Sequence, residues 1–108
     1  MELVVVGINH KTAPVEIREK FSFSPKQAAQ ASGLRKEEVV LEESIILSTC
    51  NRTEIYALTG RDKGCEGHIK NFLGRFHGLD MAHYEDRMYA YKDKKAIEHL
   101  FAVASGLD

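Results

Sequence analysis

A chain of 108 residues with 44% hydrophobic and 29% charged residues fits one soluble domain with a single core. Its net charge of -1 excludes a general attraction to nucleic acid or acidic membranes, so RNA must be held by local groups or by protein outside this chain. Two cysteines are too few for a disulfide framework, and no run resembles a signal peptide or a membrane span, so we expect a cytoplasmic protein.

The first part of the chain predicts one strand followed by two helices. Leu3–Ile8 is a short, β-branched aliphatic run, which favours a strand buried on both faces. Helices are expected over Val15–Phe21 and over residues 25–31, because a proline opens each of them and Gly33 can stop the second. The charged stretch 34–43 predicts one or two further helical turns.

The stretch 44–59 predicts a β-hairpin. Ile45–Leu47 and Thr53–Thr59 are rich in Ile, Thr and Tyr, which fit a pleated, half-buried surface. We expect Asn51 to be the turn residue, because Asn tolerates unusual backbone angles. The hairpin therefore gathers a thiol, an amide, a guanidinium and a carboxylate at one strand end, where functional groups are often placed.

The second half of the chain, after a charged turn at 60–64, predicts a helix, a short strand and a last helix. The first of these helices ends near Gly78. Its apolar face is formed by Cys65, Ile69, Phe72, Leu73 and Phe76. A loop over 79–86 leads to the alternating strand Met88–Tyr91. The last helix, from Lys94 to about Ser105, can be capped by Asp93. Its apolar stripe is formed by Ile97, Leu100, Phe101 and Ala104.

This order of elements predicts an α+β fold of the ferredoxin-like split βαβ type (βαββαβ). We expect one domain over residues 1–108, with an antiparallel sheet, helices on one face and an additional C-terminal helix. We further expect strand two to end at the edge of the sheet where strand one begins. That arrangement brings His99, on the last helix, toward Cys50 and leaves His10 at the opposite edge.

Cys50 is the first candidate for chemistry. The thiolate is the nucleophilic form of cysteine, and a nearby cation such as Arg52 favours it. The alternative is a buried structural cysteine, although the polar neighbours Thr49, Asn51 and Arg52 argue against an apolar site. Cys65 falls on the apolar face of its helix, so we assign it to the core.

Three charged or titratable side chains complete the candidate site. Arg52 is either a solvated surface charge or a bidentate clamp on a carboxylate. Glu54 shares its strand face and either holds Arg52 in place or binds a substrate ammonium. His99 lies opposite the apolar stripe of the last helix, and it is either solvated or an acid/base partner of the cysteine, as in covalent acyl transfer. The spacing of the histidines indicates no metal site, and no glycine-rich nucleotide loop follows a strand.

Three blocks of this sequence resemble one known family. They are GINHKTAPVEIREKFSFS at 7–24, LSTCNRTEIY at 47–56 and HLFAVASGLD at 99–108. In this order they are similar to the N-terminal catalytic domain of glutamyl-tRNA reductase. The segments between them carry little of the similarity. One departure is Ala102, where the family usually has a basic residue.

The resemblance implies a reaction. The family reduces glutamyl-tRNA to glutamate-1-semialdehyde with NADPH, which opens the five-carbon route to tetrapyrroles, including porphyrins. By resemblance, Cys50 is the nucleophile that forms a thioester intermediate, and His99 is the acid/base residue. The substrate-binding residues implied are Thr49, Arg52 and Glu54. The residues expected only near the site are Asn9, His10 and Lys11.

The resemblance also implies what this chain leaves out. Its end at Asp108 leads us to expect a fragment without the NADPH-binding and dimerisation domains. NADPH, a homodimer partner and contact with the downstream aminotransferase then belong to the full-length protein, and no membrane partner is expected. The alternatives are a ferredoxin-like regulatory module that binds a small ligand without covalent chemistry, and a redox-active thiol protein, for which Cys65 is badly placed as a resolving thiol.

Overall fold

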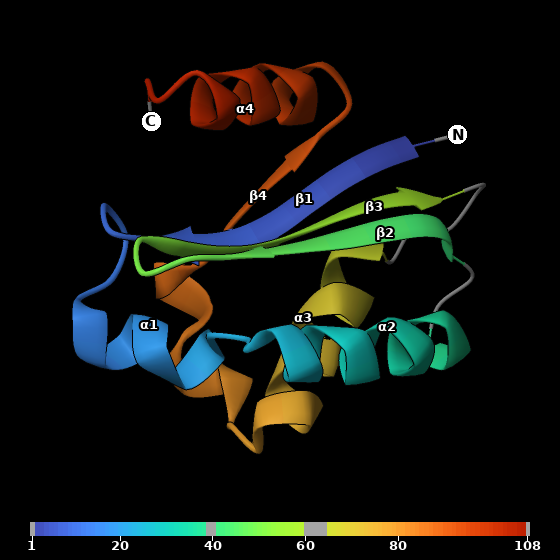
Figure 1. Ribbon diagram of the computed structural model, residues 1–108, viewed down its shortest axis with the longest axis vertical. Coiled ribbons are helices and arrows are strands. Elements are labelled where there is room, and N and C mark those ends of the chain that lie inside the picture. Colours follow the sequence, from blue (N-terminus) through green and yellow to red (C-terminus); the bar gives the residue numbers. More distant parts are fainter. Residues whose placement is uncertain (1, 39–40, 60–64, 108) are drawn as a thin grey trace.

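The computed structural model describes residues 2–38, 41–59 and 65–107, and these form an α+β fold in which a four-stranded sheet is covered on both faces (Figure 1). The strands are β1 Glu2–Asn9, β2 Leu41–Ser48, β3 Arg52–Thr59 and β4 Tyr89–Lys92. The α-helices are α1 Val15–Phe21, α2 Pro25–Glu38, α3 Cys65–His77 and α4 Lys94–Ala104. Two short 3-10 helices, Met81–His83 and Glu85–Arg87, lie between α3 and β4.

The sheet has the order β2-β3-β1-β4, and every neighbouring pair is antiparallel. Because β3 lies between β1 and β2, these two strands run in the same direction, which is the split arrangement that the sequence predicts. Helices α1, α2 and α3 cover one face, and α4 crosses the other (Figure 1). The predicted α+β class, with helices on one face and a C-terminal helix in addition, is confirmed.

The direction of β2 corrects one prediction about the site. Asn9, at the end of β1, pairs with Arg52, at the start of β3, and Ser48, at the end of β2, pairs with Thr53. The end of β1 and the turn between β2 and β3 therefore share one edge of the sheet. The expectation that strand two ends where strand one begins was wrong, because two strands flanking an antiparallel neighbour run in parallel. His10 follows Asn9 and so belongs to the Cys50 edge.

The main core lies between the sheet and the helices α1 to α3. Val4, Val6 and Ile8 are fully buried on this face of β1, and Val5 is fully buried on the other, so β1 is covered on both sides as predicted. Cys65 is 2% exposed and packs in the main core with the other predicted apolar residues of α3. Its assignment to the core is confirmed.

Several boundaries differ from the predictions. Helix α2 continues through Gly33 to Glu38, since a glycine inside a helix costs only about 1 kcal/mol relative to alanine. Strand β2 begins at Leu41, so the last part of the stretch 34–43 is strand rather than helix. The expected loop 79–86 contains most of the two 3-10 helices. Residues 39–40 and the predicted turn at 60–64 lie outside the described residues.

Helix α4 presents to the sheet a face that the apolar pattern did not predict. Ala96 is fully buried and the His99 side chain is 10% exposed, whereas Phe101 is 68% and Ile97 45% exposed. The predicted stripe therefore faces outward, which was an error of the periodicity argument. Its physical reason is that the sheet carries a buried polar group, described below, which takes the histidine in place of an apolar side chain.

The start of α4 is fixed to β1 through Asp93. Asp93 is the N-cap residue of α4, as predicted, but its side chain makes no cap hydrogen bond to the helix. The backbone N–H of Leu3 donates to Asp93 Oδ1 at 3.1 Å, and the N–H of Asp93 donates to the Leu3 carbonyl at 2.7 Å. Asp93 has a φ of 50°, in the left-handed region that single turn residues adopt. The residue thus turns the chain from β4 into α4 against the first strand.

Gly7 gives a test of this packing. A Cβ added there would lie 2.7 Å from Glu54 Cγ and 2.8 Å from the Thr53 carbonyl oxygen, so Gly7→Ala should lower the free energy of unfolding by about 1–3 kcal/mol through overpacking. Gly67→Ala is the matched control, since its Cβ meets nothing within 4 Å on α3 and should be neutral or stabilising. Urea unfolding of both variants measures the difference, and equal stabilities would contradict the close approach at Gly7.

Candidate functional site

The turn between β2 and β3 presents Cys50 to solvent. The turn is closed by the Thr49 N–H, which donates to the Arg52 carbonyl at 2.8 Å, and by the Asn51 N–H, which donates to Thr49 Oγ1 at 3.2 Å. Asn51 lies in the turn, as predicted, but it does not adopt the unusual backbone angle that was the reason for the prediction. Cys50 is exposed, which contradicts the alternative of a buried structural cysteine.

Neighbouring elements hold this turn in place. The side chain of Arg18, on α1, donates to the Cys50 carbonyl at 3.3 Å through Nε and to the Ala13 carbonyl at 2.7 Å through Nη1. Ser48 Oγ accepts the Phe23 N–H at 2.9 Å. The turn that carries Cys50 is therefore tied to α1 and to the connection between α1 and α2.

The loop after β1 lies beside this turn. Asn9 is 4% exposed, and its Oδ1 accepts the N–H groups of Lys11 at 2.9 Å and Thr12 at 3.2 Å. Asn9 therefore shapes the loop by an Asx-type turn. His10 and Lys11 are both exposed at the edge that carries Cys50. All three near-site candidates stay predictions as to function.

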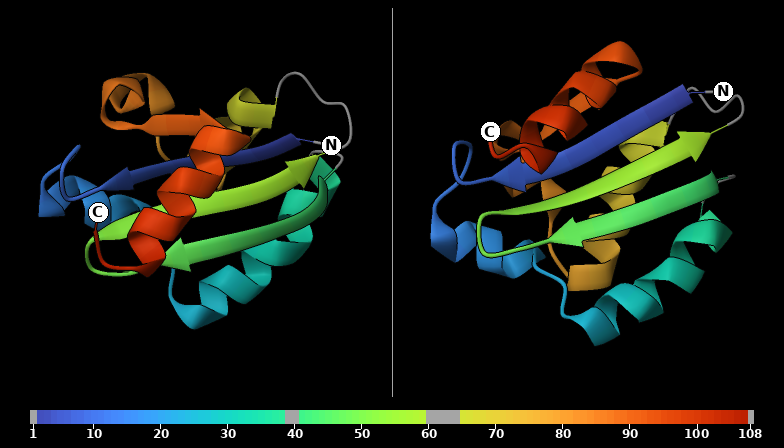
Figure 2. Two further views of the ribbon diagram at one scale, coloured as in Figure 1. Left: turned by 90° about the horizontal axis from the view of Figure 1, so that it is seen from above. Right: turned by 45° about the horizontal axis from the view of Figure 1, so that its top comes forward.

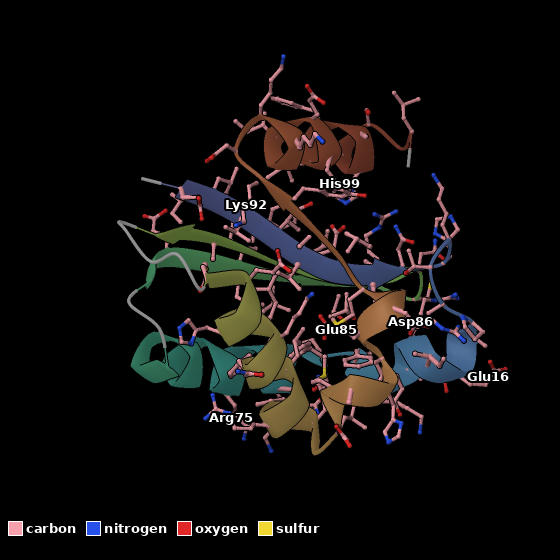
Figure 3. All side chains as sticks on the ribbon, turned by 180° about the vertical axis from the view of Figure 1, so that it is seen from behind. Glu16, Arg75, Glu85, Asp86, Lys92 and His99 are labelled. Atoms are coloured by element: carbon pink, nitrogen blue, oxygen red, sulfur yellow. The ribbon has the colours of Figure 1, made fainter. Side chains whose placement is uncertain are left out.

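The carboxylate of Glu54 is the centre of the polar cluster beneath α4. Glu54 is fully buried, and Arg52, Glu54 and Tyr56 alternate along β3 so that they share one face. Oε2 lies 3.5 Å from Arg52 Nη1, accepts the Tyr89 hydroxyl at 2.5 Å and contacts His99 Nε2. Oε1 accepts the Tyr56 hydroxyl at 2.9 Å. Figure 3 shows His99 on the side of α4 that faces the sheet.

Tyr89 comes from β4 and completes the cluster from the other side of β1. Gly7 pairs with Glu54 on β3 and with Tyr89 on β4, and its missing side chain leaves room for both. Burial, followed by the hydrogen bond to Glu54, raises the pKa of Tyr89 far above its ordinary value. The hydroxyl therefore keeps its proton and acts as a donor to the carboxylate. The Tyr89 ring also contacts the rings of His99 and Tyr91, with centroids 5.2 Å and 5.5 Å apart.

A hollow of about 660 Å³ opens between the hairpin and the C-terminal half of α4. Its lining residues are Leu47, Thr49, Asn51, Arg52, Leu100, Val103, Ala104 and Gly106. Figure 2 shows that α4 crosses the sheet diagonally and ends beside this hairpin. The hollow thus has a buried guanidinium, a threonine and a carboxamide along one side and apolar helix residues on the other. Cys50 lies in the sequence between Thr49 and Asn51, which both line the hollow.

The structure brings the predicted site residues into two adjoining groups. Thr49 and Arg52 line the hollow beside Cys50, while Glu54 and His99 meet beneath α4. Glu54 holds Arg52, the first of its two expected roles, and it lies beneath the surface with protein partners on both oxygens. Their catalytic and substrate-binding roles remain predictions.

Four residues that shape the hairpin turn or the Glu54 cluster were not singled out from the sequence: Gly7, Arg18, Tyr56 and Tyr89. The alternation of β3 was a signal for Tyr56, because it stands two residues after Glu54. Tyr89 was detectable only from the register of β4 against β1. For Arg18, nothing local in the sequence indicated a contact with a residue 32 positions away.

Cofactor sites are not evident in the described part of the chain. Among these residues no group of three His, Cys, Asp or Glu side chains is placed to hold a metal ion, and no helix is long and apolar enough to cross a membrane. The loop after β1 is folded back by the hydrogen bond that the Asn9 side chain accepts from Lys11, and the connection from β4 to α4 consists of Asp93 alone. Neither connection forms a glycine-rich phosphate loop. These two connections do not fit a dinucleotide such as NADPH.

Comparison with known proteins adds a family to this geometry. The family model described as "Glutamyl-tRNAGlu reductase, N-terminal domain" matches residues 6–108. The chain belongs to this family. Glutamyl-tRNA reductases of Thermodesulfovibrio yellowstonii and Bacillus subtilis are 48% and 45% identical over the whole chain, which spans 27% and 24% of their lengths. The solved glutamyl-tRNA reductase of Methanopyrus kandleri superposes with a TM-score of 0.68, at 36% identity over 97% of the chain and 22% of its own.

In this member of the glutamyl-tRNA reductase family the two thiols should react differently. Native protein treated with a limiting maleimide should be labelled on Cys50, which is exposed, much faster than on Cys65, which is 2% exposed and must await opening of the core. Mass spectrometry of the Cys50→Ser and Cys65→Ser variants assigns the label. Comparable rates for both thiols would contradict the placement of Cys65.

Proposed function

We propose that this chain is the substrate-binding and thioester-forming domain of a glutamyl-tRNA reductase. The full-length protein would convert glutamyl-tRNA to glutamate-1-semialdehyde with NADPH, the first step of the five-carbon route to tetrapyrroles. The chain spans about a quarter of the length of the curated relatives it matches, so it carries only part of that reaction. The observation that supports the proposal is an exposed thiol at a hairpin turn beside a hollow that contains a buried guanidinium.

Cys50 is the proposed nucleophile. In this step the thiolate sulfur bonds to the carbonyl carbon of the aminoacyl ester, the ester C–O bond breaks, and the ribose oxygen of the tRNA leaves with a proton. The product is a glutamyl thioester on Cys50 and free tRNA. The exposed position of Cys50 at the turn suits this role, because an ester at the end of a bulky RNA must approach the sulfur from solvent.

Arg52 is the proposed clamp for the side-chain carboxylate of the glutamyl group. A guanidinium binds a carboxylate in a bidentate geometry. Arg52 lines the hollow and stands two residues after Cys50 in the sequence, so a carboxylate bound by Arg52 would lie near the nucleophile. The buried Glu54 behind it fixes the guanidinium in place. Thr49, on the same wall, adds a hydroxyl that already takes part in the turn.

His99 is the proposed acid/base group that gives a proton to the departing ribose oxygen. It is held by Glu54 on the sheet side of α4, the helix that forms the other wall of the hollow. NADPH would supply hydride to the thioester, and we place its binding in the part of the full-length protein outside this chain. The isolated chain is then expected to form or hydrolyse the thioester but not to reduce it.

The proposal predicts a trappable covalent adduct. Full-length protein incubated without NADPH with tRNA carrying radiolabelled glutamate should retain the label through acid quenching, because the thioester has no hydride to consume it. Hydroxylamine should release this label, as expected of a thioester. Cys50→Ser should abolish it, and Cys65→Ser is the matched control that should keep it.

Two results would contradict the covalent role. One is label retained by the Cys50→Ser variant, which would move the nucleophile elsewhere. The other is tight binding of glutamyl-tRNA by the natural protein with no adduct at any time, which is the outcome expected of a regulatory module that only binds its ligand.

Arg52→Lys should weaken recognition of the substrate carboxylate. Loss of a bidentate charge-assisted contact costs about 1.5–3 kcal/mol, so the KM for glutamyl-tRNA should rise by roughly 10- to 100-fold. Discrimination against glutaminyl-tRNA, whose amide is neutral, should fall in parallel. Arg75→Lys, on the exposed surface of α3, is the control. An unchanged preference between the two aminoacyl-tRNAs would exclude Arg52 as the clamp.

A further inference from the structure

The two oxygens of the Glu54 carboxylate have different surroundings. Oε2 faces Arg52 Nη1, the Tyr89 hydroxyl and His99 Nε2, whereas Oε1 accepts the Tyr56 hydroxyl. Both tyrosines make the same kind of hydrogen bond to the same carboxylate. Tyr89 donates to the oxygen that contacts the histidine, whereas Tyr56 donates to the other oxygen. The Tyr89 ring also contacts the imidazole, with centroids 5.2 Å apart, and the neighbouring Tyr91 ring does so at 5.0 Å.

We propose that Tyr89 and Glu54 are positioning residues for His99, which fix its imidazole with a protonated Nε2 directed at Oε2. This inference rests on the proposed function, in which His99 exchanges a proton during thioester formation. It adds Tyr89, on an edge strand far from Cys50 in the sequence, to the residues that the reaction requires. It also assigns Glu54 to the support of Arg52 and His99 rather than to contact with the substrate.

The hydrogen-bonding capacity of the groups sets the position of the proton. An ionised carboxylate only accepts hydrogen bonds, so the ring nitrogen in contact with Oε2 must be the donor. The neutral imidazole then has its lone pair on Nδ1, so Nδ1 is the nitrogen that can accept a proton. Because the two ring nitrogens differ in this way, the carboxylate determines which of them acts in catalysis, as the triad carboxylate does for its histidine.

Tyr89 acts on this arrangement in two ways. Its hydroxyl, which keeps its proton, occupies a second lone-pair direction of Oε2 and so restrains the carboxylate against rotation. Its ring, stacked on Tyr91 at an interplanar angle of 26°, forms part of the wall against which the imidazole rests. Without the Tyr89 hydroxyl, Glu54 Oε2 loses the hydrogen-bond donor that comes from β4. The carboxylate is then less restrained, and His99 no longer has an acceptor in a fixed position.

The kinetic test uses full-length protein and the rate of adduct formation on Cys50 in a single turnover, between pH 5.5 and 8.5. Tyr89→Phe should lower this rate by about tenfold, the loss expected when a charge-assisted hydrogen bond no longer orients its partner. Tyr56→Phe, the matched removal of a hydroxyl from Oε1, should have a smaller effect. The Tyr89→Phe loss should also shift the midpoint of the pH profile, which a change in stability alone would not do.

A double-mutant cycle separates positioning from general structural damage. In the His99→Asn background, Tyr89→Phe should cause no further loss, because the group it positions is gone. An equal loss in both backgrounds would overturn the inference, as would equal effects of Tyr56→Phe and Tyr89→Phe. Glu54→Gln should reproduce the Tyr89→Phe phenotype more strongly; if it fails to fold, the tyrosine pair still decides the question.

The tautomer can be observed without the reaction. In full-length protein labelled with ¹⁵N-histidine, the ring signals of His99, assigned by their loss in His99→Asn, should show a protonated Nε2 above the titration range. A protonated Nδ1 in the neutral ring would refute the inference even if the adduct forms. Absence of the adduct on Cys50 in the natural protein would instead refute the proposed function, with the tautomer still deciding the role of Glu54.

Discussion

A buried carboxylate organises the side of the sheet that faces α4. Removing an ionised group from water costs several kcal/mol even after relaxation, and this cost is offset only where opposite charge and hydrogen bonds surround it. Glu54 has both: a guanidinium at 3.5 Å, two tyrosine hydroxyls and an imidazole. These partners come from β3, β4 and α4, so satisfying one side chain fixes three elements relative to one another. Gly7 on β1 makes the space in which they meet.

This constraint explains the orientation of α4. A helix that packed by hydrophobicity alone would turn Ile97 and Phe101 inward, yet both are exposed, and His99 and Ala96 face the sheet. Polar contact with the carboxylate therefore takes precedence over apolar burial on this face. The opposite face of the sheet follows the ordinary rule, since its strands pack apolar side chains against α1 and α3. The fold thus combines a conventional core on one face of the sheet with a polar cluster beneath α4.

The sequence predicted best what depends on local pattern. The aliphatic run of β1, the alternation of β3 and the helical spacing around Ile69 each indicate the correct element, because burial on one or both faces leaves a period in the sequence. Two predictions that depended on long-range geometry failed. The edge on which His10 lies follows from strand direction, and the outward stripe of α4 follows from a carboxylate 45 residues earlier. The candidate site residues were named from a family resemblance, whereas the contacts of Tyr89 and His99 with Glu54 depend on the register of β4 and the placement of α4.

The attachment of α4 at Asp93 has a mechanical consequence. That end of the helix is held by two hydrogen bonds to Leu3, and its far end forms a wall of the hollow beside Cys50. At 1.5 Å per residue, Gly106 lies about 20 Å from this pivot, so a tilt of roughly 3° moves the wall by about 1 Å. A displacement of that size is enough to change a reaction rate by about a hundredfold. His99 lies halfway between Asp93 and Gly106, so its contact with Glu54 restrains this tilt.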